Sequence, residues 1–477
     1  MENPRVCLIV DNPLRDLDGL VLLGSVMARK GADVFLVPMY TQGYEVPSIL
    51  PDFVLMNYAR SANEDLIRAY ANAGILVGVL ETEGGIWLSD EQYMKSIRHE
   101  CAGYIDLYCL WGIRQYDLFI KYGRWNKDKL VVTGHPRFDF YSYPWINTVD
   151  SIPTQGHPVV LINTSFSLSF PRFARNAGHE IRNLMKAGFK ESYMKERVTA
   201  ELKIRKDLLE VIKMLSSDFS DVLFIIRPHP FENDREYYTS FHNLKNVQVR
   251  REHTVAPWLK AACLMLHLNS STAVDAFLMG KSAVTMDWIN YDIIRNMSKL
   301  TCDLSYKCHS YEELKTIIAE SVQSETYSLQ QKHYYNDQVK SDIRALFHQI
   351  DGNTAHRIAT AIFQKISRRQ KKPSVKKCRI MALYGSKNSK LMKGWIDGIS
   401  RFCMGATVHD FLRTWIFTRN IGLGTKQDKK LNWNTVTRLL NKIQTISDKE
   451  NISFVSENCK SINLQARTCG SSIHIHQ

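Results

Sequence analysis

The first 140 residues alternate short apolar runs with longer amphipathic stretches. The apolar runs of strand length lie at residues 5–10, 33–40, 52–58 and 74–80. Between them, residues 14–30 and 61–73 repeat their apolar positions with helical periodicity. This alternation is typical of a parallel, doubly wound α/β sheet, whose strands are apolar throughout because helices cover both faces.

The same pattern begins again after a loop-rich linker at residues 141–157. Its strand-length runs lie at residues 158–163, 221–226, 246–250, 263–268 and 282–286. A long amphipathic stretch at 194–216 predicts a helix, and helical patterns between 311 and 367 suit a closing layer. The sequence therefore predicts two tandem Rossmann-like domains, at 1–140 and 158–367, with a substrate cleft between them.

The charge of the chain is concentrated after these two domains. The 477 residues carry a net charge of +14, and residues 368–477 hold 21 Lys and Arg against 6 Asp and Glu. The rest of the chain is close to neutral, so a nucleic-acid partner loses its main support. Basic residues of this helical or irregular tail are interleaved with Trp395, Phe402, Phe411, Trp415 and Phe417. Two interpretations stay open: docking on an anionic membrane surface, or a solvated, partly disordered tail.

The sequence lacks several features that would indicate secretion, membrane insertion or particular enzyme classes. No secretion signal and no spanning apolar run is visible, and the ten cysteines are scattered singly. We expect a cytoplasmic protein, either free or held peripherally at the inner face of the membrane. The motifs of dehydrogenases, P-loop kinases, serine hydrolases and zinc proteases are missing, and no metal motif or cofactor motif stands out.

The first candidate site follows the apolar run at 74–80. Glu81 and Glu83 are two residues apart and precede Gly84 and Gly85. In extended backbone such carboxylates point to the same side, and a partly desolvated pair would contain one carboxyl of raised pKa. That group could act as general base on an acceptor hydroxyl. The alternative is a solvated acidic loop that caps the next helix.

The second candidate is the sequence Arg-Pro-His-Pro, again at a predicted strand end. Two prolines, one of them Pro230, would hold this loop rigid. We expect the side chains of Arg227 and His229 to point toward a common position. A guanidinium beside an imidazole suits the phosphate of a nucleotide leaving group. A structural loop is the alternative.

The third candidate lies between a predicted strand and a predicted helix. It consists of four small polar residues, Asn269, Ser270, Ser271 and Thr272. Hydroxyls and free backbone amides at a helix start favour an anion such as phosphate, although a simple helix cap also uses Ser and Thr.

Two weaker candidates follow other predicted strands and would open onto the cleft or serve as scaffold. His135 and Arg137 come at the end of the first domain. Asn163, Thr164 and Ser165 follow the first strand of the second domain.

Taken in order, these motifs resemble a known family. The segments Glu-Thr-Glu-Gly-Gly, Thr-Gly-His-Pro-Arg-Phe-Asp, Ile-Asn-Thr-Ser-Phe, Arg-Pro-His-Pro-Phe-Glu and Asn-Ser-Ser-Thr-Ala-Val-Asp are similar to those of bacterial surface carbohydrate biosynthesis proteins. Those proteins are similar to the capsule and lipopolysaccharide Kdo transferases. The resemblance covers about residues 5–284 and implies a GT-B glycosyltransferase fold with a nucleotide-activated donor, a CMP-sugar.

The resemblance also implies roles for particular residues. His229 with Pro230, and Ser270 with Ser271, would hold the nucleotide phosphate. The acidic motif would supply the base, but Thr82 stands where the family has its first acid, so either Glu81 or Glu83 could be that base. Cys263 replaces another acid of the family, which leaves the stereochemistry of transfer undecided.

These inferences predict a glycosyltransferase of capsule or lipopolysaccharide synthesis. It would move a sugar, an acidic one such as Kdo, from a CMP-sugar to a glycan or lipid-linked acceptor, without metal. The rivals are a nucleotide-sugar 2-epimerase or polyol-phosphate transferase on the same fold, and a binding subunit without turnover.

Overall fold

A computed structural model gives the fold of the chain. It describes residues 3–85, 87, 89–174, 176–186, 189–323, 337–370, 372–384, 430–449, 465–469 and 472–476. Contacts divide the chain into two compact units. The first unit is Met1–Thr148 with Ile343–Gln477, and the second is Val149–Asp342. Each unit is described by itself.

The first unit is built on a largely parallel sheet with the strand order β13-β14-β2-β1-β3-β4-β5-β6. Its strands are β1 (Arg5–Val10), β2 (Asp33–Pro38), β3 (Phe53–Met56), β4 (Leu76–Leu80), β5 (Leu107–Leu110), β6 (Leu130–Val132), β13 (Gln465–Cys469) and β14 (Ser472–His476). Its helices are α1 (Pro13–Arg29), α2 (Gln42–Ile49), α3 (Glu64–Asn72), α4 (Asp90–Ser96), α5 (Ile113–Lys121), α16 (Thr354–Ser367), α17 (Val375–Tyr384) and α19 (Trp433–Lys449). The inner strands are buried throughout, as their continuous apolar sequence predicts.

The second unit is built on a parallel sheet with the order β12-β11-β10-β7-β8-β9. Its strands are β7 (Val159–Asn163), β8 (Leu223–Arg227), β9 (Val247–Val249), β10 (Ala262–His267), β11 (Ala283–Met286) and β12 (Tyr306–Cys308). Its helices are α6 (Ala177–Lys186), α7 (Glu191–Asp218), α8 (Arg235–Phe241), α9 (Val255–Ala261), α10 (Thr272–Leu278), α11 (Asp292–Arg295), α12 (Lys299–Asp303) and α13 (Tyr311–Gln323). The helix α15 (Asp337–Phe347) crosses the boundary between the two units. The predicted α/β class with two Rossmann-like sheets is confirmed.

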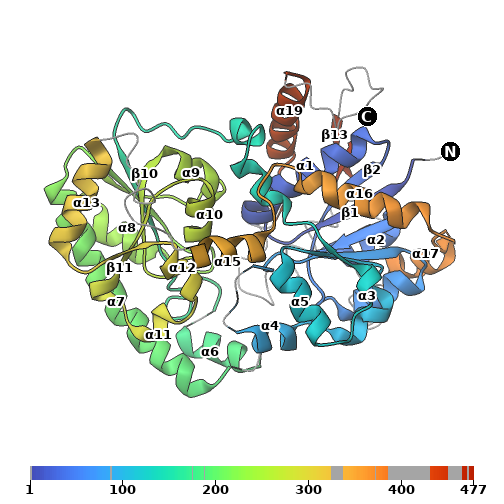
Figure 1. The fold of residues 1–477 in the computed structure, drawn as a ribbon, viewed down its shortest axis with the longest axis horizontal. Coiled ribbons are helices and arrows are strands. Elements are labelled where there is room, and N and C mark those ends of the chain that lie inside the picture. The colour runs from blue at the N-terminus through green and yellow to red at the C-terminus, as the bar shows by residue number, and fades with distance from the viewer. Residues whose placement is uncertain are drawn as a thin grey trace. The chain divides into compact units, whose positions relative to one another are not determined.

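The chain after residue 342 does not follow the predicted domain boundaries. The closing helix α16 was expected in the second domain, but it packs on α1 of the first unit (Figure 1). The hydrogen bonds at its first turn explain this, because Asp139 of the first unit accepts from the backbone amides of Thr354 and Ala355 at 3.0 and 2.9 Å.

The described part of the basic tail is integrated into the first unit. Strand β14 pairs antiparallel with β2, and its residues Ile473 and Ile475 are buried. An edge strand left unpaired exposes its backbone groups, so β14 with β13 extends and covers this edge of the sheet. Helix α17 packs on α2. The aromatic residues expected to dock on a membrane, Trp395, Phe402, Phe411, Trp415 and Phe417, lie outside the described residues.

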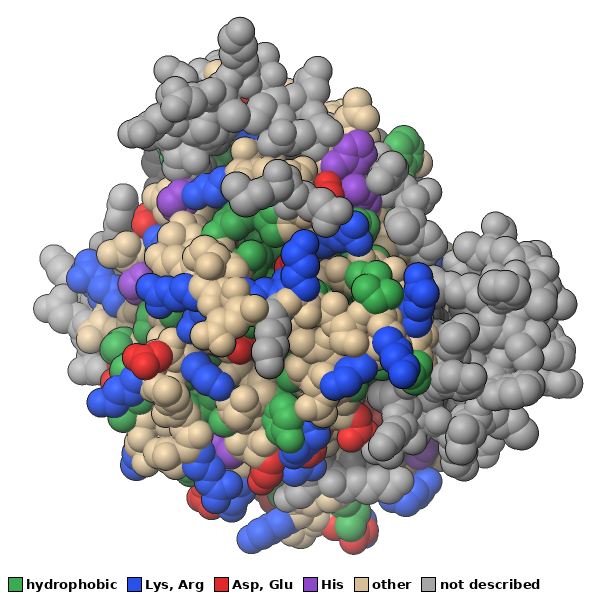
Figure 2. Space-filling view, turned by 90° about the vertical axis from the view of Figure 1, so that its right-hand side faces the viewer, with side chains coloured by type: hydrophobic (Ala, Val, Ile, Leu, Met, Phe, Trp, Pro, Cys, Tyr) green, Lys and Arg blue, Asp and Glu red, His purple; other side chains and the backbone are tan. Residues whose placement is uncertain are grey.

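The described surface of the first unit mixes side chains of different kinds. On the face shown in Figure 2, Lys and Arg side chains are interspersed with hydrophobic and acidic ones. Across the described ranges of the chain, no helix is both long and apolar enough to cross a membrane.

Candidate functional site

Some of the polar candidates lie at or beside the point in each sheet where the strand order reverses, and the others follow strands farther out. In the first unit β1 lies between β2 and β3, so the order reverses at the carboxyl ends of β1 and β3, beside β4, where open α/β sheets form a crevice. In the second unit the reversal falls between β7 and β10. Ligands of open α/β sheets bind at such points, because neighbouring loops diverge there and leave room. Glu81 and Glu83 follow β4, and Asn163 and Ser270 follow β7 and β10.

Glu81 is fully buried and held by neutral donors and one cation. Its Oε1 accepts from the Tyr108 hydroxyl at 2.6 Å and from the Ala59 amide at 3.4 Å. Its Oε2 lies 3.3 Å from the guanidinium of Arg60. Burial raises the pKa of Glu81 and outweighs the opposing effect of Arg60. Glu81 is therefore a carboxyl within the protein, not at its surface.

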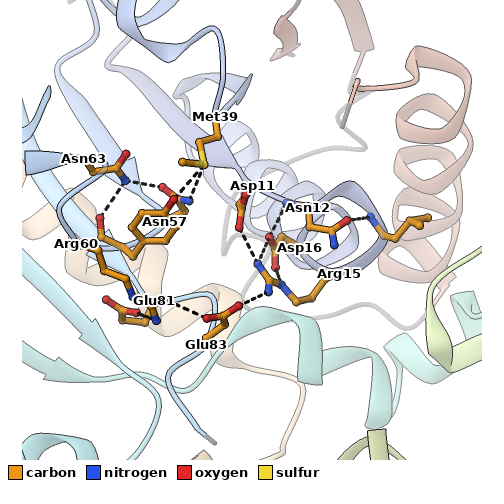
Figure 3. A network of polar contacts seen from close by, with 12 residues as sticks. Asp11, Asn12, Arg15, Asp16, Met39, Asn57, Arg60, Asn63, Glu81 and Glu83 are labelled. Carbon is orange, nitrogen blue, oxygen red and sulfur yellow. Dashed lines mark hydrogen bonds and ion pairs between the residues drawn. The ribbon is translucent and has the colours of Figure 1, made fainter. Parts of the chain in front are cut away.

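Glu83 lies beside Glu81 but has the opposite electrostatics (Figure 3). Its side chain is 55% exposed and forms ion pairs with Arg15 at 3.1 Å and Arg60 at 3.0 Å. Desolvation works against ionisation of Glu83, but these two guanidinium groups outweigh it and lower its pKa. The expected raised pKa therefore applies to Glu81 alone, and the carboxylate that a substrate can reach is Glu83.

Arg15 ties the carboxyl end of β1 to the same network. It lies in the first turn of α1, which begins at Pro13 after the N-cap Asn12, whose side chain accepts from the Leu14 amide. Its guanidinium contacts Asp11 at 3.0 Å and Asp16 at 2.7 Å as well as Glu83. The network thus joins loops from β1, β3 and β4 by ion pairs.

The glycines after Glu83 have a packing role that the sequence does not reveal. A Cβ on Gly84 would lie 2.8 Å from the indole of Trp111, and one on Gly85 would lie 2.6 Å from Phe347. Trp111 is buried, and its Nε1 donates to the backbone oxygen of Glu81 at 2.6 Å. Neither glycine has a positive φ, so close packing and not a left-handed backbone requires glycine at these two positions.

The loop after β6 is largely internal. His135 is buried against Trp111, with ring centroids 4.9 Å apart, and burial holds its pKa well below the ordinary value. Arg137 lies over Trp111 and Phe138, 4.9 and 4.5 Å from their centroids. The backbone of this loop touches α1 so closely that a Cβ on Gly19 would lie 2.5 Å from the Arg137 nitrogen. These contacts favour the scaffold interpretation for His135.

In the second unit, Arg227 stands at the end of β8 as expected. It donates to the backbone oxygens of Glu252 at 2.7 Å and His253 at 3.1 Å, and it lies 5.5 Å from the centroid of Trp258. Burial lowers the pKa of Arg227 to about 10. Two of its donors therefore hold a neighbouring loop.

His229 is half-buried, and its tautomer follows from its neighbours. The Phe231 amide donates to Nδ1 at 3.2 Å, so the neutral ring carries its proton on Nε2. Pro230 next to it is exposed. Phe231, which is 44% exposed, stands with its ring 5.8 Å from that of His229 and 5.5 Å from that of Phe173.

A buried carboxylate that the sequence reasoning missed fixes this loop. Glu232 Oε2 accepts from the Thr164 hydroxyl at 2.8 Å, the Phe166 amide at 3.0 Å and the His229 amide at 3.3 Å. Its Oε1 accepts from the Tyr237 hydroxyl at 2.7 Å. Burial raises the pKa of Glu232 despite these donors. Glu232 thus joins the loops after β7 and β8. In the sequence, the one indication of this role is its position three residues after His229.

The loops after β7 and β10 meet through a short chain of neutral groups. Asn163 Nδ2 donates to the Thr272 hydroxyl at 2.7 Å, and that hydroxyl lies 2.8 Å from the Ser270 hydroxyl. Asn163 is buried, and its Oδ1 has no hydrogen-bond partner among the described residues. An unpartnered buried oxygen is costly, which marks this crevice as a place where a polar ligand would fit.

The remaining candidates around β10 divide into exposed and structural residues. Ser271 is exposed, and the Ser165 hydroxyl lies 3.4 Å from the Asn269 oxygen. The Asn269 side chain is committed to the protein, because it donates to Ile294 and accepts from Thr301. The helix α10 that follows has only 7 residues. Asn269 thus positions the loop.

His267 is a second residue that the sequence reasoning missed. It is buried in β10 and accepts at Nδ1 from the Ser270 amide at 3.2 Å. Its Nε2 lies 2.7 Å from the Ser305 hydroxyl, which itself donates to the Thr301 oxygen. Burial lowers the pKa of His267 to about 3, so the ring is neutral and holds the Ser270 loop. Within the described ranges, no group of three His, Cys, Asp or Glu side chains could hold a metal.

Comparisons with known proteins define the fold class. No protein-family model and no curated protein matches the sequence. Among solved structures, the wall teichoic acid polymerase TagF superimposes with a TM-score of 0.50 at 12% identity, over 78% of this chain and 91% of that one. An S. aureus MnaA structure with UDP gives 0.48 at 11% identity, over 78% and 99%. The UDP-GlcNAc 2-epimerase of Methanocaldococcus jannaschii gives 0.46 at 12% identity, over 76% and 99%. The chain has the GT-B class of fold, and at these identities the likeness extends to the fold alone.

Proposed function

We propose that this chain is a glycosyltransferase of surface polysaccharide synthesis that uses a nucleotide-activated sugar. The observation that carries the proposal is that, in each of two Rossmann-like units, chemically active groups meet at the reversal of strand order. The solved structures similar in fold include a wall teichoic acid polymerase and enzymes named for UDP-GlcNAc. The choice of a CMP-sugar, with an acidic sugar such as Kdo, rests on the resemblance of the sequence motifs.

The second unit would bind the nucleotide end of the donor. His229 can donate from Nε2 to a phosphate oxygen, because Phe231 keeps Nδ1 as an acceptor. The hydroxyls of Ser270, Ser271 and Thr272 would supply further donors beside the unpartnered Asn163 oxygen. Arg227 adds positive charge at the same strand ends, with Pro230 keeping the loop rigid. As the bond from the anomeric carbon to the phosphate oxygen breaks, these groups would stabilise the charge on the leaving CMP.

The first unit would act on the acceptor. We assign the contact with the acceptor hydroxyl to Glu83, because Glu81 is fully buried. Glu83 would orient the hydroxyl and take up its proton as the oxygen bonds to the anomeric carbon. Glu81 would be a positioning residue that holds Arg60. The proposed reaction uses no metal and no cofactor.

The place of the enzyme in the cell belongs to the same proposal. We place it in the cytoplasm, at the inner face of the membrane where lipid-linked acceptors reside, and attribute its attachment to the net positive charge of the chain after residue 367. Co-sedimentation of the full chain with anionic and with neutral vesicles tests this. Equal sedimentation with both would contradict it.

Turnover of the purified chain tests the reaction. With CMP-Kdo and an acceptor glycan we expect release of CMP, reduced about a hundredfold in a His229→Ala variant because one donor to the developing charge is lost. The control is His242→Ala, which removes a histidine hydrogen-bonded only locally to Thr239. Full CMP release by His229→Ala would contradict the role of His229.

Product analysis separates the rivals. Conversion of UDP-GlcNAc into another UDP-linked sugar would favour an epimerase, and polymer formation from CDP-glycerol would favour a polyol-phosphate transferase. Binding of nucleotide without any product would favour a binding subunit.

A further inference from the structure

A groove distant in sequence from the strand-end loops lies along helix α19 in the first unit. It has a volume of about 620 Å³ and is open to solvent. One wall is α19, and the other includes Asn147 and Thr148 of the 3₁₀ turn Trp145–Thr148. Lys442 of α19 donates to the Thr148 oxygen at 3.2 Å and so joins the two walls at one end.

Helix α19 has two faces with different partners. Val436, Leu440, Ile443 and Ser447 are buried, and this face packs on α1 of the same unit. These positions recur every three or four residues, which is the stripe of an amphipathic helix that is held firmly. The opposite face is therefore presented rigidly to solvent, and it lines the groove.

The groove combines an aromatic surface with short polar side chains. Trp433 is 43% exposed, although large aromatic side chains are usually covered. Asn434 and Asn441 line the same groove and are exposed. Thr148, Thr437 and Thr445 add hydroxyl-bearing side chains to the lining, although the Thr437 oxygen itself is buried. Amides and hydroxyls that both donate and accept suit the hydroxyls of a sugar, and a flat indole suits its apolar face.

The charged side chains among the described residues that line the groove are basic. Arg438 and Lys442 line it, and the described lining includes no Asp or Glu. A guanidinium and an ammonium about one turn apart complement carboxylates carried on successive sugars.

We propose that this groove binds an acidic oligosaccharide, so that the protein holds a uronic or ulosonic acid chain away from the strand-end loops. The proposal deepens the proposed function and rests on it for the identity of the glycan, because an acidic polymer is the product of the proposed reaction. A few hundred Å³ is the usual size of a site for a small ligand, and here it would hold two or three sugars.

The shape and the composition favour a glycan over a membrane surface. A helix that lies on a membrane presents a row of large apolar side chains. Along the outward face of α19, Trp433 is the large exposed hydrophobic residue within the described ranges, and its neighbours are amides and hydroxyls.

Titration of the full-length protein with trigalacturonate, followed by calorimetry, tests the proposal. Maltotriose is the neutral probe of equal length. We expect trigalacturonate to bind at least about tenfold more tightly than maltotriose, because it adds charge pairs to the same sugar contacts. Added salt should reduce this difference. Equal binding of the two probes, or none, would overturn the proposal.

Substitutions assign the binding to the groove. Trp433→Ala should weaken trigalacturonate binding about tenfold, and Arg438→Gln about fivefold. Both side chains are exposed, so circular dichroism should show an unchanged fold. The control is Lys95→Gln, which removes a 72% exposed lysine of the same unit. Equal weakening in the control, or unchanged binding in Trp433→Ala, would overturn the assignment.

Two further results separate this proposal from its alternatives. Binding to anionic vesicles that is lost in Arg438→Gln, without binding of trigalacturonate, would overturn it in favour of a membrane surface. Trigalacturonate binding without any donor turnover would leave the groove intact and contradict the proposed function instead. Turnover without trigalacturonate binding would contradict the groove alone.

Discussion

The strand-end loops of the two units differ in how charged and neutral side chains are arranged. In the first unit, Arg15 and Arg60 are paired with Glu81, Glu83 and neighbouring carboxylates. In the second unit, hydroxyls, an amide and the neutral imidazole of His267 lie around the reversal point, and the buried Glu232 joins the neighbouring loops after β7 and β8. In the first unit charged groups are paired with one another, whereas the groups around Asn163 and Ser270 in the second unit are neutral and the cation Arg227 stands at the end of the neighbouring strand β8.

This difference suits two different ligands. A carboxylate between two guanidinium groups stays ionised, so it can orient a neutral hydroxyl group by accepting a hydrogen bond from it. Neutral donors suit an anion, since an exposed carboxylate there would repel it. This difference agrees with the proposal that the first unit binds the acceptor and the second unit binds the donor. Substitutions in either unit can test it.

Removal of the buried carboxylate of the second unit should have the largest effect. Glu232→Ala leaves donors of Thr164, Phe166, His229 and Tyr237 without their acceptor, so we expect a loss of about 4 kcal/mol in the free energy of unfolding. Hydrogen exchange in the peptides of β7 and β8 measures it. Glu210→Ala, which truncates a 62% exposed carboxylate of the same unit, should change little. A small effect of Glu232→Ala would show that the loops hold without it.

The paired carboxylates of the first unit come next. Glu83→Gln should lower kcat about a hundredfold with little change in thermal stability, because the side chain is exposed and acts on the substrate. Glu81→Gln should instead lower the Tm, since it disturbs the buried contacts with Tyr108 and Arg60. The measurement is turnover and Tm for both variants.

The opposite result would reverse the assignment. A folded Glu81→Gln variant without turnover, beside an active Glu83→Gln variant, would make Glu81 the base. Because the pKa of Glu83 is lowered, the rate should also be independent of protonation of this group at neutral pH.

The packing behind this network gives a smaller effect. Gly84→Ala places a Cβ 2.8 Å from the ring of Trp111, which is buried and bonded to the Glu81 backbone, so it cannot move aside freely. We expect a loss of about 2 kcal/mol in stability, measured by chemical unfolding, and weaker turnover. The matched control is Gly103→Ala in the same unit, where a Cβ would meet nothing within 4 Å. Equal effects of the two changes would remove the packing argument.

The sequence predicts the elements better than their partners. Runs such as Val-Val-Leu-Ile-Asn at β7 are apolar throughout, so strands and the polar loops at their ends are visible from periodicity. The Ser-Ile-His-Ile-His of β14 alternates apolar and polar residues, which also predicts a strand. Its pairing with β2, however, spans more than 400 residues. No local pattern encodes such a contact. The sequence of the tail therefore shows its net charge but not the strand with which it pairs.

The candidate site was predictable to the level of loops and not of atoms. Glu81 and Glu83 were both visible, but the turn between them buries one and exposes the other. Glu232 and His267 were missed, because an isolated polar residue beside a strand looks like any loop or strand-end residue. Their importance comes from burial and from donors on other loops.

Because the buried His267 is neutral in the folded protein, the stability of the second unit should depend on pH. The expected effect is smaller than those of the substitutions above. The pKa of His267 is about 3 in the folded protein, against an ordinary value of 6.5 when exposed. Between these values the unfolded chain binds a proton that the folded unit does not, so stability falls as pH decreases below 6.5. At pH 5.5 the loss from this one group is about 1.4 kcal/mol. His267→Gln should therefore flatten the dependence of β10 hydrogen exchange between pH 7 and 5.5, whereas His242→Gln should leave it unchanged. An unchanged slope in His267→Gln would mean that this ring is not held neutral, and the contrast between the two crevices would lose its electrostatic basis.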